Sequence, residues 1–149
     1  MTDADTAERV TVRLDVPADA SYAVLLRAAL AALAARQEFS LDRIEDLRLA
    51  GTEAFSLVVM RAEPGATVHI TITAGTDDID VTATALSRPE LRAKGGPGAL
   101  GWTLLTSLVD QLSDIEAEAE SGIWLSVRSD QATPVPPRTT PIDSAESAN

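Results

Sequence analysis

Residues 46–59, "DLRLAGTEAFSLVV", combine the spacing of a buried helix with a carboxylate in the middle of the stretch. Apolar and small residues recur every three or four positions, as on a helix that faces a core. Burying a carboxylate costs free energy unless it is hydrogen-bonded, paired or turned toward a cavity. Glu53 is therefore a candidate site residue, although its neighbours Thr52 and Ser56 also allow it to lie at the edge of the stripe and point to solvent.

The helix around Glu53 is expected to begin near residue 40 and to end before Pro64. Asp42 and Glu45 have the spacing of a capping box, which satisfies free backbone N–H groups at a helix start. The residues of the buried stripe are expected to be Ile44, Leu47, Gly51, Ala54 and Val58.

The residues upstream predict a strand followed by another helix. Apolar and polar residues alternate through residues 9–16, a pattern typical of a half-buried strand. Pro17 ends this strand, and Asp19 or Ser21 can cap a helix that runs to about Gln37.

Two hairpins supply the remaining strands. Apolar positions alternate on both sides of a turn at 75–78 within residues 66–86, and a second hairpin is expected to turn at Ser121–Gly122. The order is then strand, helix, helix, hairpin, loop, helix, hairpin. It predicts an α+β fold, a two-layer sandwich in which three helices cover one face of a mostly antiparallel sheet.

The size and composition of the chain are those of one globular domain. Of its 149 residues 45% are apolar, and none is cysteine, which excludes disulfides, thiolate metal sites and cysteine nucleophiles. We predict a domain over residues 9–128, between an acidic tail at 1–8 and a Pro/Ser/Thr-rich tail at 129–149, both disordered. The N-terminus does not resemble a signal peptide, and no apolar run approaches the roughly 20 residues of a membrane span, so a cytoplasmic location is expected.

The formal net charge of −11 limits the classes of partner. It argues against direct binding of nucleic acid, because phosphates would be repelled. It suits a basic protein partner, and solubility alone also explains it.

A glycine-rich segment, "KGGPGALG" at 94–101, leads directly into the third predicted helix, which runs from Trp102 to about Asp110. That helix is expected to bury Leu104, Leu105, Leu108 and Val109. Glycines let the backbone approach a ligand, and a helix N-terminus presents unpaired N–H groups to an anion, so the segment could hold the phosphates of a nucleotide. It is also explained as an ordinary connector. The candidate nucleotide-binding residues are Lys94, Gly95, Gly96, Gly98 and Gly101.

No metal site is predicted from the remaining polar residues. His69 is the only histidine and has no acidic or serine partner nearby in the sequence, so it is expected to be structural or exposed. The acidic residues Asp77, Asp78 and Asp80 are expected to solvate a turn, because a metal site needs a fuller set of ligands.

Two segments together resemble the bacterial anti-sigma-factor serine kinases of the RsbW and SpoIIAB type, whose fold is that of the histidine-kinase-like (GHKL) ATPase domain. The family's helix with a Glu-x-x-x-Asn motif is matched by "IEDLRLAGTEAFSLVV", and its closing section by "ALGWTLLTSLVDQLSDIEAEAESGIWLSVR". The resemblance covers roughly residues 9–128 and includes the order of elements.

The resemblance implies a role for Glu53 and also shows departures from the family pattern. The Glu of the motif acts as a base near the ATP γ-phosphate, and Glu53 takes that position. Leu57 stands where the family has the Asn that binds magnesium, and an apolar side chain offers this cation no oxygen ligand. The segment "TATALSRPE" lacks the Asp-x-Gly-x-Gly motif that receives adenine, and Ala99 replaces the first glycine of the later turn.

Three functions are consistent with these residues. The first is a non-catalytic regulator that binds a sigma factor, a STAS-type anti-anti-sigma protein, or both in exchange. The second is an active ATP-dependent serine/threonine kinase that phosphorylates a STAS protein, because phosphoryl transfer relies mainly on positioning and charge. The third is a switch that binds ATP or ADP without transfer. The resemblance also implies a homodimer.

Overall fold

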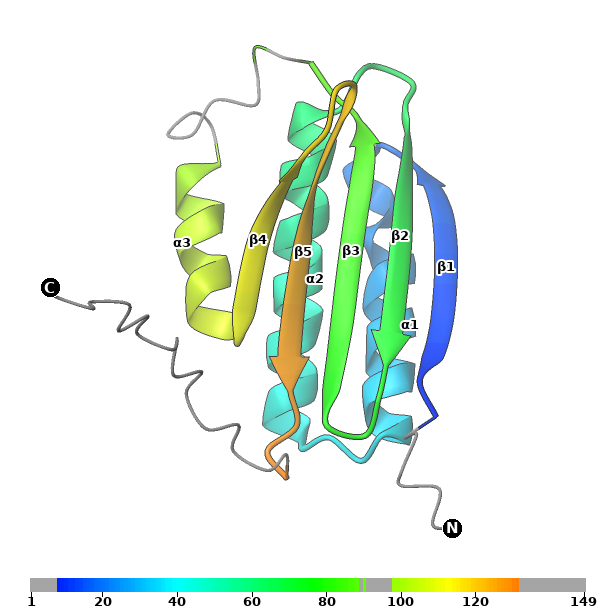
Figure 1. Ribbon diagram of the computed structural model, residues 1–149, viewed down its shortest axis with the longest axis vertical. Helices are drawn as coiled ribbons and strands as arrows, with labels where there is room; N and C mark the ends of the chain where they lie inside the picture. The colour runs from blue at the N-terminus through cyan, green and yellow to red at the C-terminus, as the bar shows by residue number, and fades with distance from the viewer. Residues whose placement is uncertain (1–7, 89, 91–97, 132–149) are drawn as a thin grey trace, which may run out of the picture.

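The structure, a computed structural model, describes residues 8–88, 90 and 98–131. Its elements follow the predicted order (Figure 1). The strands are β1 (Val10–Pro17), β2 (Thr67–Ala74), β3 (Asp78–Leu86), β4 (Gln111–Glu116) and β5 (Glu120–Arg128). The helices are α1 (Ala23–Arg36), which follows a 3-10 turn at Ala20–Tyr22, then α2 (Leu41–Arg61) and α3 (Ala99–Leu108).

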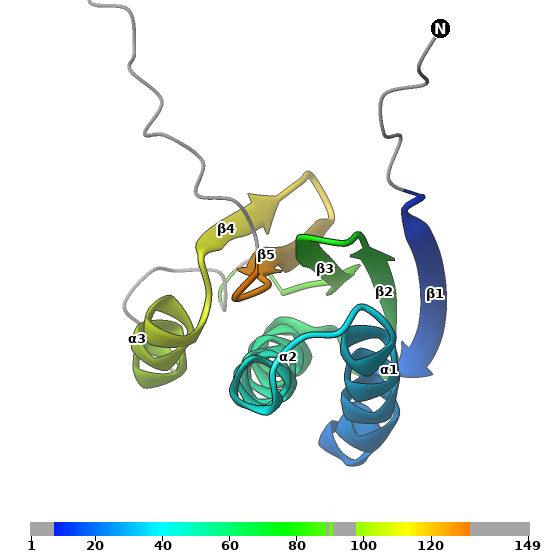
Figure 2. The ribbon, with the colours of Figure 1, turned by 90° about the horizontal axis from the view of Figure 1, so that it is seen from below.

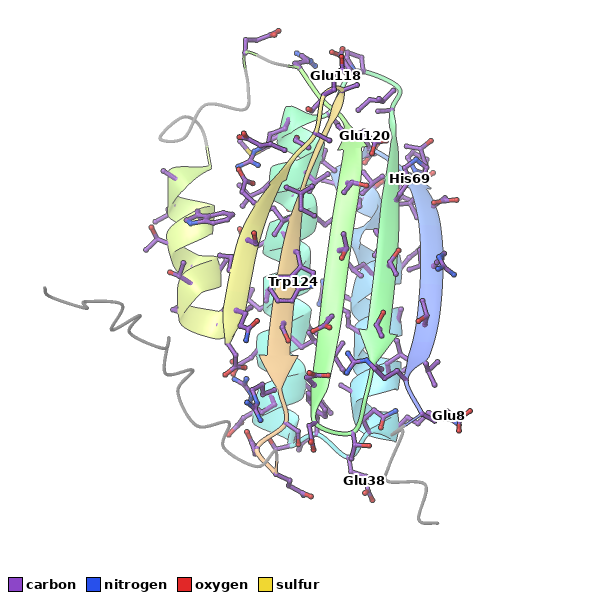
Figure 3. The ribbon with its side chains drawn as sticks, in the orientation of Figure 1. Glu8, Glu38, His69, Glu118, Glu120 and Trp124 are labelled. Carbon is purple, nitrogen blue, oxygen red and sulfur yellow. The ribbon has the colours of Figure 1, made fainter. Side chains whose placement is uncertain are left out.

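The five strands form one sheet in the order β1-β2-β3-β5-β4, and every neighbouring pair is antiparallel. All three helices lie on one face of this sheet, with α2 between α1 and α3 (Figure 2). The other face is open and carries His69 and Trp124 (Figure 3). The predicted two-layer α+β sandwich is thus confirmed. Within the described residues, no helix is both long and apolar enough to cross a membrane.

The core lies between the helix layer and the sheet, and α2 contributes the largest helical share of it. Four of the five residues predicted for the α2 stripe are buried, and only Ile44 is half-buried. The helix-facing residues of β2 and β3 alternate as predicted on both sides of their turn. A Cβ on Gly51 would overlap the Leu30 side chain of α1, so the glycine allows the two helices to pack closely.

The caps of the first two helices are only partly as predicted. Asp19 caps the 3-10 turn at Ala20–Tyr22, whereas the N-cap of α1 itself is Tyr22. The Asp19 side chain accepts hydrogen bonds from the Ser21 hydroxyl and amide, which lower the pKa of Asp19, so the contribution of this cap to stability is lost as pH falls through that lowered pKa. The predicted capping box at Asp42 is wrong. Ser40 caps α2 by accepting the Arg43 amide, which leaves Asp42 inside the first turn.

Arg43 links the first turn of α2 to the start of β4 and the end of β5. Its guanidinium binds Asp46 at 3.1 Å and Asp110 at 2.5 Å, and its Nε donates to the Arg128 carbonyl at 2.9 Å.

The ordered contacts continue past β5, since the Ser129 amide donates to the Asp77 carbonyl. The bounds predicted for the domain, 9–128, stay a prediction, and most of both predicted tails lies outside the described residues.

Replacing Arg43 by Ala is expected to lower the free energy of unfolding by about 1–3 kcal/mol, because three charge-assisted hydrogen bonds are lost at once. Arg48→Ala is the matched control on the same helix, since Arg48 forms an ion pair with the exposed Glu45 and such pairs contribute about 0.5 kcal/mol or less. Urea unfolding of both variants measures the difference. Equal losses in the two variants would contradict a linking role for Arg43.

The third helix differs from its prediction. It starts at Ala99 rather than Trp102, and it ends at Leu108. Only Leu105 is fully buried, whereas Leu104 is 36% exposed and Leu108 is half-buried. The reason is its place at the side of the helix layer, where it packs mainly against α2 and also against β4 (Figure 2).

The last hairpin also turns elsewhere. The turn lies at residues 117–119, where the Ala117 amide donates to the Glu120 carbonyl, and not at Ser121–Gly122. Gly122 lies inside β5, directly opposite Thr84 of β3. A Cβ there would overlap the Ala83 carbonyl oxygen, so close strand packing, and not a turn, is what requires this glycine.

Candidate functional site

The structure brings Glu53 and Leu57 of α2 together with two glycines at the start of α3. A Cβ built on Gly101 would lie 3.2 Å from the Glu53 Oε2 atom and 3.4 Å from the Leu57 Cδ2 atom. A Cβ on Gly98 would lie 2.6 Å from the same Leu57 atom. Two separate stretches of sequence that were singled out as candidates therefore meet in one place.

Gly98 determines how closely α3 approaches α2. It is the N-terminal cap of α3 with φ +110°, and its carbonyl accepts the Trp102 amide at 3.0 Å. Any other residue would be strained at this φ and would also clash with Leu57. The absence of a side chain is thus required by packing against α2.

Glu53 is half-buried, and its carboxylate faces the first turn of α3. Within residues 8–88, 90 and 98–131 it makes no hydrogen bond or ion pair. The unpaired N–H groups of a helix N-terminus favour a negative charge nearby, which helps to stabilise a carboxylate in this position. Its predicted catalytic role stays a prediction.

Leu57 occupies the position where a magnesium ligand is implied, and it is 4% exposed. Its side chain packs against the backbone of Gly98 and Gly101, so the space beside it is filled by apolar contact. Magnesium requires near-octahedral oxygen ligands, and Leu57 supplies none. No group of three or more His, Asp or Glu residues in the described part of the chain could hold a metal ion. Leu57 therefore does not fit the role of a magnesium ligand.

The rest of the predicted nucleotide segment cannot be placed in this site. Lys94, Gly95 and Gly96 lie outside the described residues. Their predicted contact with phosphates stays a prediction.

His69 has a partner that its sequence neighbours did not indicate. The β1–β2 register places it directly opposite Asp15, with 2.7 Å between His69 Nδ1 and Asp15 Oδ1. Both side chains are exposed on the open face of the sheet.

The acidic residues near the β2–β3 turn were expected only to be solvated. Two of them, Asp78 and Asp80, form ion pairs with Arg9. Such pairs depend on strand register, which local sequence does not show.

A groove of about 330 Å³ lies between α1 and α2, away from Glu53. Its lining residues are Arg27, Glu45, Asp46, Arg48, Leu49 and Thr52. Two arginines face two carboxylates, and the groove therefore has no excess charge of one sign. None of the predicted site residues lies in it.

Comparison with known proteins identifies relatives of this chain. Residues 16–128 match the family described as "Histidine kinase-like ATPase domain". The chain is 30% identical over 101 residues to "Anti-sigma-F factor RsbW" of Mycobacterium tuberculosis, covering 68% of this chain and 59% of that protein. It is 27% identical over 125 residues to "Serine-protein kinase RsbW" of Bacillus cereus, covering 72% of this chain and 78% of that protein. It thus spans less than two thirds of the mycobacterial relative.

Proposed function

Because the chain belongs to the histidine kinase-like ATPase domain family and is similar to RsbW proteins, we propose that it regulates transcription by binding other proteins, without transferring phosphate. The proposed partners are a sigma factor, a STAS-type anti-anti-sigma protein, or both in exchange. The observation that carries the proposal is the burial of Leu57 against the start of α3.

Phosphoryl transfer and protein binding make different demands on this scaffold. Transfer relies on precise positioning of the phosphates and on metal ions that neutralise developing charge. An apolar residue at position 57 removes a ligand for that metal. Binding a partner needs only a surface, which the α+β sandwich retains. One relative is named an anti-sigma factor and another a serine-protein kinase. Proteins similar to this chain are thus named for both activities.

The charge of the chain supports a protein partner with a basic surface. A net charge of −11 accelerates association with such a partner at low salt and disfavours direct contact with DNA. A sigma factor, which must itself bind DNA, has this chemistry. We place the complex in the cytoplasm and include the homodimer in the proposal.

The expected result of a direct test is binding without transfer. The purified chain is mixed with candidate sigma factors and STAS proteins, with ATP and magnesium, and both complex formation and phosphoserine are measured. We expect a stable complex and no phosphoserine, and we expect Glu53→Ala to leave the affinity unchanged. Phosphoserine on a STAS protein that disappears in Glu53→Ala would establish the active kinase instead.

Nucleotide binding is tested by thermal unfolding. We expect no change in Tm with millimolar ATP or ADP, with or without magnesium. A ligand at about 100 times its Kd adds roughly 2.7 kcal/mol to the native state and would raise Tm by about 2–8 °C. A rise without magnesium would favour the nucleotide switch, for which Gly98 and Gly101 at a helix start are the supporting observation.

A further inference from the structure

The side of the sheet opposite β1 ends in a strand with a free edge. β4 is the terminal strand there, and within the described residues it pairs with β5 alone. The Ala117 amide donates to the Glu120 carbonyl, so the hydrogen-bonded pairs of this ladder fall on the odd-numbered residues of β4. The amides of Leu112, Asp114 and Glu116 therefore point away from β5, where an added strand would meet them.

The helix layer extends beyond this edge of the sheet. Figure 2 shows α3 farther out than β4, with α2 on the inner side of α3. A strand added to β4 would thus lie over α3 and would extend the sheet to match the helix layer. α3 contains no charged residue, and Leu100 is 84% exposed and Leu104 36% exposed. This side of the molecule therefore offers an uncharged, partly apolar surface next to the free strand.

All the charges on this side are negative. Residues 98–127 include no Lys, Arg or His but five acidic residues, Asp110, Asp114, Glu116, Glu118 and Glu120. The first two have cationic partners within the fold, since Arg43 binds Asp110 and Arg61 binds Asp114 at 2.7 Å. The three glutamates form no ion pair within the part of the chain that the structure describes. Figure 3 shows Glu118 and Glu120 where the β4–β5 hairpin turns.

We propose that the edge of β4 binds an extended, basic segment of the protein that this chain regulates, added to the sheet as a further strand. Backbone hydrogen bonds to the free edge supply affinity, and alternate side chains of the segment supply specificity. Its lysine or arginine residues face Glu116 and the neighbouring glutamates, and its apolar residues face Leu112 and Ile115. This assignment rests on the proposed function, because it takes the regulated protein as the partner.

The same carboxylates disfavour a second copy of this chain at the β4 edge. In a two-fold antiparallel pair, one residue lies opposite its own copy, and the others pair symmetrically about it. A register about Ser113 places Asp110 opposite Glu116. A register about Ile115 places Asp114 opposite Glu116, and one about Asp114 places that residue opposite itself. Like charges directly opposite each other destabilise a strand pair, and charged edge strands are a means of avoiding such pairing.

A basic segment has the charge that this edge lacks. Unlike charges directly opposite each other stabilise a strand pair, and the net charge of −11 speeds the encounter with a basic partner. Nucleic acid does not suit the same edge, because its phosphates would be repelled by the glutamates. Since these carboxylates are at the surface, we expect the affinity to fall as salt rises.

A synthetic peptide tests the edge without knowledge of the partner. The probe is a blocked peptide of alternating lysine and valine, as long as β4, and amide hydrogen exchange of the full chain is measured by NMR with and without it. We expect slower exchange at Leu112, Asp114 and Glu116. A peptide with glutamate in place of lysine, or with every backbone nitrogen methylated, should give no protection. Protection at β1 instead of β4, or protection by the methylated peptide, would overturn the proposal.

Charge reversal tests the glutamates. The double substitution Glu116→Lys with Glu118→Lys is expected to weaken peptide binding at least about tenfold. The matched control is Glu38→Lys with Asp77→Lys, which makes the same change in net charge at exposed positions, and Figure 3 shows Glu38 at the opposite end of the molecule from Glu118. It should change the affinity less than about threefold, because distant charges are screened. The Tm of each variant verifies folding, and equal weakening by both pairs would overturn the site.

The regulated protein then separates the site from the function. We expect the peptide to compete with the sigma factor or STAS protein, and Glu116→Lys with Glu118→Lys to weaken that complex as it weakens peptide binding. A complex that neither the peptide nor the substitutions affect would overturn the site and leave the proposed function intact. Protection of β4 by the peptide, when no candidate protein forms a complex, would support the site and contradict the proposed function.

Other occupants of the edge would give different results in the same exchange measurement. Without peptide, protection of the β4 amides that grows with protein concentration would identify a second copy as the occupant. Protection that is lost when residues 132–149 are removed would identify the end of this chain as the occupant. Either result would overturn the proposal.

Discussion

Replacing Leu57 by Asn is expected to lower the free energy of unfolding by about 3–5 kcal/mol and to create no magnesium-dependent nucleotide binding. The side chain is 4% exposed and packs against the backbone of Gly98 and Gly101. An amide there would lose the apolar contacts and bury polar groups without partners. The substitution restores the residue type that the family motif has at this position. It therefore tests whether the missing amide is all that prevents magnesium binding, or whether the surrounding site no longer accepts the ion.

Two controls and two measurements make this test decisive. Leu57→Met keeps the volume and should cost less than about 1.5 kcal/mol, and Leu49→Asn, on an exposed part of the same helix, should change stability by no more than about 0.5 kcal/mol. Urea unfolding gives the stability, and Tm with ATP and magnesium gives binding. A stable Leu57→Asn variant whose Tm rises only with both ligands would show that the site still accepts a metal-bound nucleotide, against the proposal.

The parts of the fold that local pattern determines were predicted. Alternation in residues 66–86 depends only on which side chains face the core, and the β2–β3 hairpin confirms it. The stripe of α2 follows from the helical period in the same way. The order of elements then favoured one architecture, an antiparallel sheet covered by helices on one face.

The errors concern contacts between residues that are distant in sequence. Ser121–Gly122 has the composition of a turn, but the approach of β3 places Gly122 inside β5. The third helix begins at Ala99 and not at the predicted Trp102. Gly98 precedes it as the N-cap with a positive φ, and packs against Leu57 of α2. Neither neighbour is visible from local sequence.

The candidate site was predicted in part for the same reason. The unusual position of Glu53 on an apolar stripe was visible locally, and the glycines before the third helix were a composition signal. Their meeting, and the burial of Leu57 between them, required the packing of α3 on α2. Pairs such as Asp15 with His69 required the strand register.

Gly122→Ala is expected to lower the free energy of unfolding by about 3 kcal/mol or more, because overpacking against rigid backbone leaves little room for relaxation. The added Cβ would overlap the Ala83 carbonyl oxygen and would lie 2.9 Å from the Thr84 Cα atom. Both atoms belong to the backbone of β3, at the centre of the sheet. The strands would have to separate locally, which would weaken the β3–β5 ladder on both sides of the substitution.

Gly65→Ala is the control that distinguishes crowding from backbone strain. Gly65 has φ +77° but open space around it, so an alanine there should cost only about 1–2 kcal/mol, the penalty of a left-handed conformation. Urea unfolding of both variants gives the comparison, and hydrogen exchange locates the change. Faster exchange confined to β3 and β5 in Gly122→Ala is expected. A smaller loss for Gly122→Ala than for Gly65→Ala would show that β5 moves away from β3 at low cost, and that the glycine is not required by strand packing.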